Sequence, residues 1–323
     1  MNSIKHIKNI DSCLNKKLSL PNSVYKYNNK IIIADSGNHR ICVLEEESEF
    51  ELCGQFGLGK YKLKEPVYAA IDNENIYVCD WHNHRVVIYD LELKSYINEI
   101  GILSGTSDGL VKKILKFFIN MASRGTFLNS HFLLKNTQPK LNLLKKSFSF
   151  LEALLYYLVN FRNIDFRVKI SKPNGCIILG EQLIFTQKDN ASISVYDLKK
   201  GKICKEVYNG HKDINFGRLG QIAHYKKYIY VCDETHNLIW IFNEKFELNK
   251  KITLTSYNIF SISISDKYIA TCGSTSFSIF NHNYTLLFES NGNGEYHGIF
   301  IDNNSLYVAN RLKNRIEIYE LLK

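Results

Sequence analysis

The chain has 323 residues, of which 45% are hydrophobic, 23% charged and 13% aromatic. This composition excludes a disordered or collagen-like protein and predicts a globular fold with an aromatic-rich core. The formal net charge is +9, and where that excess lies along the chain bears on function.

The N-terminal residues 1–13 contain Lys, His and Asn where a secretory signal peptide has an apolar run. The eight cysteines form no C-x-x-C pair. We interpret them as small core residues in a reducing compartment. The predicted location is therefore cytoplasmic, with attachment to a membrane surface as an alternative.

A repeated segment recurs along the chain. Residues 31–43, 76–88, 229–241 and 306–318 each contain an apolar strand, an Asp or Asn, a polar turn and a second alternating strand, and residues 183–195 and 269–280 are weaker copies. The first strand of each copy closes at Asp35, Asp80, Gln187, Asp233, Gly273 and Asn310, with spacings of 45, 107, 46, 40 and 37 residues. Four short strands at a period near 40 are typical of a β-propeller blade.

The turns of these units resemble the NHL repeat. The resemblance rests on Asp35, Asn38, His39 and Arg40, on the copy Asp80, Asn83, His84 and Arg85, and on partial copies at Asp233, His236, Asn237 and Leu238 and at Asn310, Asn314 and Arg315. It supports an all-β fold, a six-bladed β-propeller. Proteins with such propellers include RNA binders, protein-interaction platforms, hydrolase relatives and a metal-dependent lyase, so the resemblance leaves function open.

The recurring turn residues are predicted to be structural. Asp and Asn side chains bond nearby backbone groups in tight turns, and an Arg that opens the next strand pairs with an Asp. A catalytic group is needed once, whereas a group that locks a blade is needed in each blade. This role is assigned to Asp35, Asn38, Arg40, Asp80, Asn83, Arg85, Asp233, Asn310 and Arg315.

The last unit ends after its third strand, at residues 315–321. An uncovered sheet edge is a liability, and residues 3–10 alternate apolar and polar positions imperfectly. We therefore expect this N-terminal segment to add the outer strand of the sixth blade and close the ring.

The long spacing between units two and three places an insertion at residues 102–170. The pattern predicts a helix over residues 110–121 and a second over about 141–161. The predicted organisation is a closing strand with blades one and two at 1–101, a basic helical insertion at 102–170, and blades three to six at 171–323.

The insertion contains eleven cations and three anions, which accounts for +8 of the net charge of +9. An anionic partner is therefore expected to meet it. The predicted contacts are Lys112, Lys113, Lys116, Arg124, Lys145 and Lys146. Three interpretations remain: a helical subdomain that packs on the ring with its lysines in water, a membrane-surface element, or a docking element for protein or nucleic acid.

The sequence lacks a G-x-x-x-x-G-K loop, an H-E-x-x-H pair and a G-x-S-x-G elbow. A propeller site is instead expected at the residues that open the innermost strands, which alignment places near Asn22, Val67, Asn174, Gly220, Phe260 and His297. These positions offer one His and no carboxylate, so we predict no metal, no cofactor and no catalytic residue. The channel and ligand candidates are Asn22, Asn174 and His297, with Trp81, His82 and His84 as a nearby cluster.

We interpret the protein as a non-enzymatic binding platform that uses the insertion and the adjacent face of the propeller. A protein partner ranks first, an anionic membrane surface second and nucleic acid below both. A small-molecule ligand in the channel remains an alternative. So does an enzyme of the propeller lyase or hydrolase type around His297, and so does a scaffold peripheral to a membrane.

Overall fold

The computed structural model describes residues 3–45, 48–57, 59–92, 94–101, 170–210, 213–254, 258–290, 292 and 294–322. Contacts divide the chain into two compact units, residues 1–99 with 170–323 and residues 100–169. The predicted helices and the six candidate contact cations of the insertion lie outside the described residues. The extent of the insertion and the division into domains stay predictions.

The described residues form six four-stranded sheets and one two-stranded sheet. Five of the four-stranded sheets consist of consecutive strands, and the sixth joins β1 to β24, β25 and β26. Blade one holds β4 (Pro21–Tyr27), β5 (Lys30–Asp35), β6 (Arg40–Leu44) and β7 (Glu49–Cys53), and blade two holds β8 (Pro66–Ile71), β9 (Asn75–Asp80), β10 (Arg85–Asp90) and β11 (Tyr96–Gly101). Blade three holds β12 (Pro173–Leu179), β13 (Gln182–Gln187), β14 (Ser192–Asp197) and β15 (Lys202–Tyr208), and blade four holds β16 (Leu219–Tyr225), β17 (Tyr228–Asp233), β18 (Leu238–Asn243) and β19 (Leu248–Ile252). Blade five holds β20 (Ile259–Ile264), β21 (Ile269–Gly273), β22 (Phe277–Phe280) and β23 (Leu286–Glu289), and blade six holds β24 (Tyr296–Ile301), β25 (Ser305–Asn310), β26 (Arg315–Leu322) and β1 (Ser3–Ile10).

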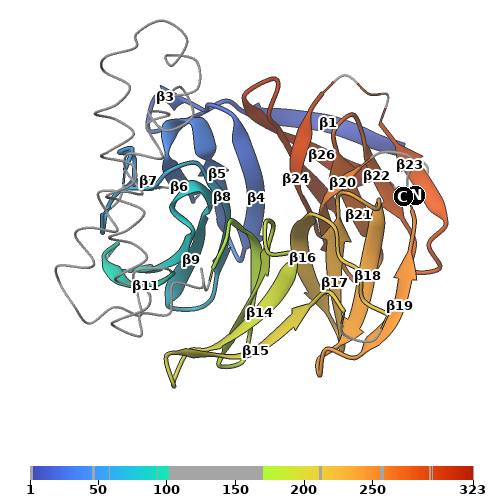
Figure 1. Cartoon of the computed structure of the whole chain (residues 1–323). Coiled ribbons are helices and arrows are strands. Elements are labelled where there is room, and N and C mark those ends of the chain that lie inside the picture. Colours follow the sequence, from blue (N-terminus) through green and yellow to red (C-terminus); the bar gives the residue numbers. More distant parts are fainter. Residues whose placement is uncertain are drawn as a thin grey trace, which may run out of the picture. The chain divides into compact units, whose positions relative to one another are not determined.

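The six innermost strands form a closed circle. Contacts run from β4 to β8, β12, β16, β20 and β24, and from β24 back to β4, so the six blades form a closed ring (Figure 1). The prediction of an all-β, six-bladed propeller is confirmed, and the third and fifth units, which depart most from the repeat, are blades like the others.

The two ends of the chain close the ring. Strand β1 pairs antiparallel with β26, from Ser3 opposite Leu322 to Ile10 opposite Ile316, and the termini lie together (Figure 1). This pairing confirms the predicted closure. A short hairpin of β2 (Ser12–Cys13) and β3 (Lys16–Lys17) then leads into blade one.

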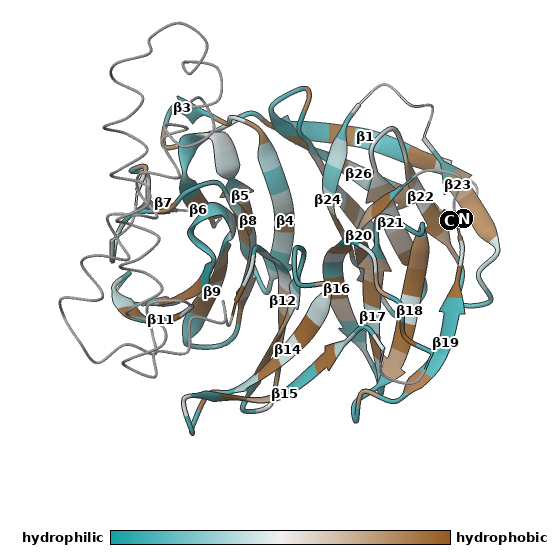
Figure 2. Ribbon diagram, viewed as in Figure 1, coloured by the Kyte–Doolittle hydropathy of each residue, from teal (hydrophilic) through white to brown (hydrophobic). Residues whose placement is uncertain are grey.

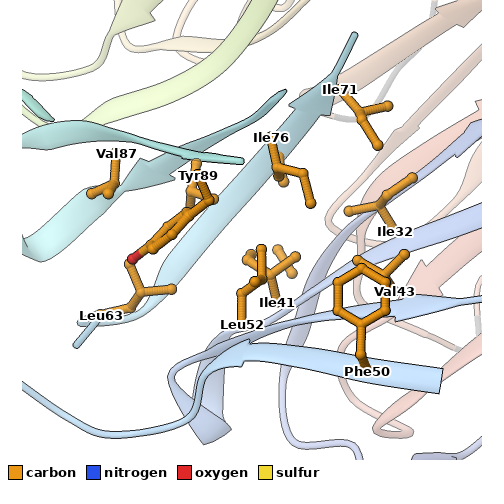
Figure 3. Close-up of a cluster of buried hydrophobic side chains, with 13 residues drawn as sticks. Ile32, Ile41, Val43, Phe50, Leu52, Leu63, Ile71, Ile76, Val87 and Tyr89 are labelled. Carbon is orange, nitrogen blue, oxygen red and sulfur yellow. The ribbon is translucent and has the colours of Figure 1, made fainter. Parts of the chain in front are cut away.

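The core lies between neighbouring blades, because both faces of each blade are covered. Between blades one and two, for example, Ile32 and Ile41 pack with Ile76, Val87 and Tyr89 (Figure 3). Hydrophobic residues dominate strands in the middle of a blade such as β18, whereas the outermost strands β1 and β19 carry hydrophilic residues (Figure 2). This gradient reflects the burial of β18 and the exposure of β19.

A side chain at the end of the second strand anchors the loop that enters each of blades one to four. The Asp35 carboxylate accepts the backbone N–H of Ser19 at 2.7 Å, and Asp80 accepts that of Lys64 at 2.7 Å. The other two anchors are Gln187 to Ser171 N at 2.6 Å and Asp233 to Gly217 N at 2.8 Å. Each acceptor lies 16 residues after its donor, so Gln187 does in blade three what Asp does elsewhere.

Candidate functional site

The six inner strands share an irregularity at the point where they open. In every blade the pairing register shifts next to the first residue of the inner strand. A β-bulge of this kind leaves a residue unpaired and re-aims its side chain. The bulged positions include the predicted channel residues Asn22, Val67, Asn174, Gly220, Phe260 and His297.

These positions surround one cavity of about 470 Å³. Five of the six predicted residues line it, and in blade four the side chain of Gln221 takes the place of Gly220. Two further sets of aligned positions join them. The residues just before an inner strand contribute Glu65, Arg218, Asn258 and Glu295, and the residues just after a second strand contribute Trp81, Lys188, Glu234 and Arg311. We call this cavity the polar mouth.

The strand-opening positions carry no carboxylate, but the cavity that they line does. Glu65, Glu234 and Glu295 all line the polar mouth. They were missed because they lie in loops beside the strands rather than at the strand-opening positions. The signal was nevertheless in the repeat, because each of them sits at a fixed offset from an aligned strand end.

A buried ion pair lies where blades three and four meet. The Nζ atom of Lys188 is 2.8 Å from Oε1 of Glu234, and Asn174 donates to the same oxygen at 3.3 Å. Burial lowers the pKa of Lys188 and raises the pKa of Glu234. Each charge therefore depends on the other, because desolvation disfavours either one alone.

A histidine and a carboxylate face each other in blade six. The Nε2 atom of His297 lies 2.7 Å from Oε1 of Glu295, and Arg311 is 3.9 Å from the same oxygen. Burial lowers the pKa of His297 to about 4, so the imidazole is neutral at pH 7. The ring packs on Phe260 with centroids 4.8 Å apart.

The predicted cluster of Trp81, His82 and His84 is divided among three environments. Trp81 opens the 3₁₀ turn η2 (Trp81–Asn83) and lines the polar mouth. His82 lies 3.3 Å from the Glu65 carboxylate and lowers its pKa. His84 accepts the backbone N–H of Lys172 at 3.3 Å. In the described part of the chain, no group of three or more His, Cys, Asp or Glu side chains is arranged to hold a metal ion.

Arg218 differs from the other charges of the mouth. It is exposed, and no ion pair to its guanidinium is found among the described residues, although its backbone N–H donates to Thr235 at 2.9 Å. Lys188 and Lys172 lie over the face of Trp81, 5.9 and 5.0 Å from the ring centroid. Among the described residues the Arg218 guanidinium is thus without an ion-pair partner, whereas the Trp81 ring already carries two lysines.

The turn residues of the first two blades have their hydrogen-bonding capacity filled. Buried Arg40 donates to Asp35 at 2.7 Å and to Glu51 at 2.6 Å, and Arg85 pairs in the same way with Asp80 and Glu99. Asn38 and Asn83 each donate to the Asp of their own turn at 2.8 Å. In blade six Arg315 and Asn310 both donate to Glu317.

Comparison with known proteins bears on the fold and the repeat. The family model of the NHL repeat matches residues 64–89, which span β8, β9, η2 and β10. A solved structure, the crystal structure of the computationally designed Ika8 protein, is 7% identical and matches with a TM-score of 0.50 over 93% of this chain and 71% of that chain. At this identity the likeness concerns the fold alone.

A search of curated proteins finds no match. Among the residues that the structure describes, no helix has the length and apolar character needed to cross a bilayer. The repeat match and the arrangement of six blades agree with the resemblance that the turn residues indicate. The chain is a six-bladed β-propeller that carries an NHL repeat.

Proposed function

We propose that this protein is a non-enzymatic binding platform that holds a protein partner at the polar mouth. The observation that carries the proposal is the gathering of side chains from all six blades around one open concavity. Charged groups of both signs, two aromatic rings and amides lie together there. Protein interfaces combine aromatic anchors with arginine in this way.

Exposed Arg218 is the residue best placed to meet a partner. The cations and anions around it are already paired with each other, whereas Arg218 has no ion-pair partner in the described part of the chain. A partner that supplies a carboxylate gains a charge-assisted hydrogen bond without breaking an existing pair. The proposed partner therefore presents an acidic residue to blade four.

The test compares two charge reversals on opposite faces of the ring. Arg218→Glu alters the polar mouth, and Lys226→Glu alters the exposed turn between β16 and β17 at the other end of the same blade. Immobilised wild-type protein and both variants are incubated with cell extract, and bound proteins are quantified by mass spectrometry. A partner of this site is retained by Lys226→Glu and reduced at least about tenfold by Arg218→Glu. Equal recovery by all three proteins would contradict the proposal.

The basic insertion is proposed to supply further contact with the partner, because it carries +8 of the net charge. Replacing Lys112, Lys113, Lys145 and Lys146 by Gln should weaken binding of the partner and its dependence on salt. Vesicles with and without phosphatidylserine provide the second arm. Salt-sensitive binding of wild type to the anionic vesicles alone would favour a membrane scaffold over a protein platform.

A second candidate function is a lyase or hydrolase, and the His297–Glu295 pair favours it. A neutral imidazole 2.7 Å from a carboxylate is an arrangement that general bases use. Turnover of ester and lactone substrates that His297→Ala abolishes, while Lys226→Glu retains it, would assign the mouth to an enzyme. Turnover that His297→Ala leaves unchanged would exclude this role for the pair.

A further inference from the structure

The central channel has a second opening, at the other ends of the same six inner strands. A cavity of about 390 Å³ lies there, with lining residues from β4, β8, β12, β16, β20 and β24. This volume falls at the small end of the range of about 300–1,000 Å³ found for ligand pockets. We call it the tyrosine mouth, after Tyr25, Tyr27 and Tyr68.

The side chains around the tyrosine mouth are mainly hydrophobic. Seven isoleucines and Phe300 line it together with the three tyrosines. The Tyr25 and Phe300 rings pack edge to face with centroids 5.4 Å apart. No Lys or Arg is among the described lining residues, so these residues offer no permanent positive charge to an anionic ligand.

The charged and polar side chains of the cavity have partners of their own. Asp72 accepts the hydroxyl of Tyr77 at 2.8 Å and the backbone N–H of Asn75 at 2.7 Å. His224 lies 3.0 Å from the Glu244 carboxylate. The remaining polar contacts are Tyr27 to Asn73, Ile301 N to Ser263, and Cys176 to the carbonyl of Tyr77.

The hydroxyl groups of Tyr68 and Tyr25 are the exception. Among the described residues neither hydroxyl has a hydrogen-bond partner, although Tyr68 as a whole is only 7% exposed. Neither oxygen is among the fully enclosed polar atoms that lack a partner, so both still reach open space. Buried polar groups are almost always hydrogen-bonded, so a ligand that brings an acceptor atom into the cavity can take these two hydroxyl donors in place of water.

From the hydrophobic wall and the two unpaired hydroxyls we infer that the tyrosine mouth binds a small uncharged molecule with a hydrophobic ring and a hydrogen-bond acceptor oxygen. Tyr68 donates to the acceptor, and the partly exposed hydrophobic side chains of the lining contact the ring, namely Ile177, Ile178, Ile264 and Phe300. Burial raises the pKa of Tyr68 well above its usual value, so the phenol keeps its proton at neutral pH. The site is independent of the protein partner proposed for the polar mouth.

The two mouths are separated by a narrow part of the channel around Gln221 and Gly298, which we call the waist. Gln221 donates to the carbonyl of His297 at 3.5 Å and accepts the hydroxyl of Ser261. The inner strands also approach closely there, and a Cβ atom on Gly298 would lie 2.5 Å from Cα of Ser23. A molecule in the tyrosine mouth is therefore not expected to contact Arg218.

Two probes of nearly the same shape test the inference. Acetophenone carries an acceptor oxygen, whereas ethylbenzene replaces the carbonyl by a methylene group. Titration followed by ligand-observed NMR should give tighter binding of acetophenone to the wild-type protein. Tyr68→Phe should weaken acetophenone about fivefold, the value of one hydrogen bond of about 1 kcal/mol, and leave ethylbenzene unchanged.

Tyr230→Phe is the matched control, because Tyr230 is a buried strand tyrosine outside the tyrosine mouth. It should bind both probes like the wild type, as should Arg218→Glu. Ala223→Leu, which fills part of the cavity, should weaken both probes together. Equal affinity of wild type for the two probes, no binding of either, or an unchanged acetophenone affinity in Tyr68→Phe would overturn the inference.

Discussion

The polar mouth and the tyrosine mouth are opposite ends of the same six strands, yet they differ in chemistry. At the polar mouth the lining side chains come from bulges and adjoining loops. At the tyrosine mouth they come from regular ladder positions such as Tyr25 opposite Ile32 and Ala70 opposite Tyr77. These strand positions lie next to the cores between the blades, and hydrophobic residues prevail there. Most of the charged side chains of the two mouths lie at the bulges and in the adjoining loops, where the regular strand pairing is interrupted.

The largest expected effect follows from opening the ring, on which both mouths depend. Deleting residues 1–10 removes the seven residue pairs between β1 and β26. At about 1 kcal/mol for each net hydrogen bond, the loss is about 5 kcal/mol or more. Thermal unfolding should shift down by at least about 10 °C, and both mouths should lose their ligands. A truncated monomer with an unchanged melting temperature would contradict the role of β1.

A smaller effect should distinguish the two mouths. Asp80→Ala leaves Arg85 buried beside Glu99 alone and releases the backbone of Lys64, the neighbour of Glu65 in the polar mouth. Breaking a buried ion pair costs about 3–5 kcal/mol, measurable by urea denaturation. Partner binding should fall while acetophenone binding persists. An equal loss of partner binding and acetophenone binding would show that Asp80 supports both mouths alike.

Acid should lower the stability of the protein through His297 in the polar mouth. His297 has a pKa of about 4 in the folded protein and about 6.5 when unfolded, so between these values only the unfolded state takes up the proton. Stability should therefore fall by about 2 kcal/mol as the pH drops from 6.5 to 4. His297→Gln should flatten this dependence when denaturation is followed across the same pH range. If the stability of the variant and of the wild type depended on pH in the same way, His297 would be excluded as the source of the acid destabilisation.

The smallest effect concerns the waist. Gln221→Ala removes the link from blade four to His297 and Ser261 and should cost about 1 kcal/mol. Gln221 is one lining residue of the polar mouth, but the substitution leaves Arg218 and the lining of the tyrosine mouth in place, so Arg218-dependent partner binding and acetophenone binding should both remain. Urea denaturation and the two binding assays check this. Loss of either ligand would mean that the mouths form a single site.

The architecture was predictable because each repeat unit contains several signals at fixed offsets. The second strands end at all six predicted residues, from Asp35 to Asn310. Gln187 and Gly273 each end the second strand of their blade, although neither is the Asp found at this position in the repeat. The strand pattern survives such substitutions because packing between blades, rather than the turn residue, determines where the strands lie.

The site was predictable only in part. The bulge positions were found by alignment, but Glu65 and Glu295 precede their strands and Glu234 follows one. The residues at the equivalent positions of the other blades differ in type, so no single residue type repeats at these offsets. The tyrosine mouth was missed for another reason: its residues alternate like any core strand, and sequence periodicity does not show whether a cavity remains.

The anchor in blade three has a consequence for how this propeller changes over evolution. Gln187 holds Ser171 where the chain re-enters the ring, and the preceding Ile170 is fully buried. Residues of the ring itself thus hold the chain where it returns. Doubling the length of a connection adds only about 0.6 kcal/mol of closure entropy. We therefore expect the entry to blade three to tolerate a preceding connection of different length and charge without a change of fold.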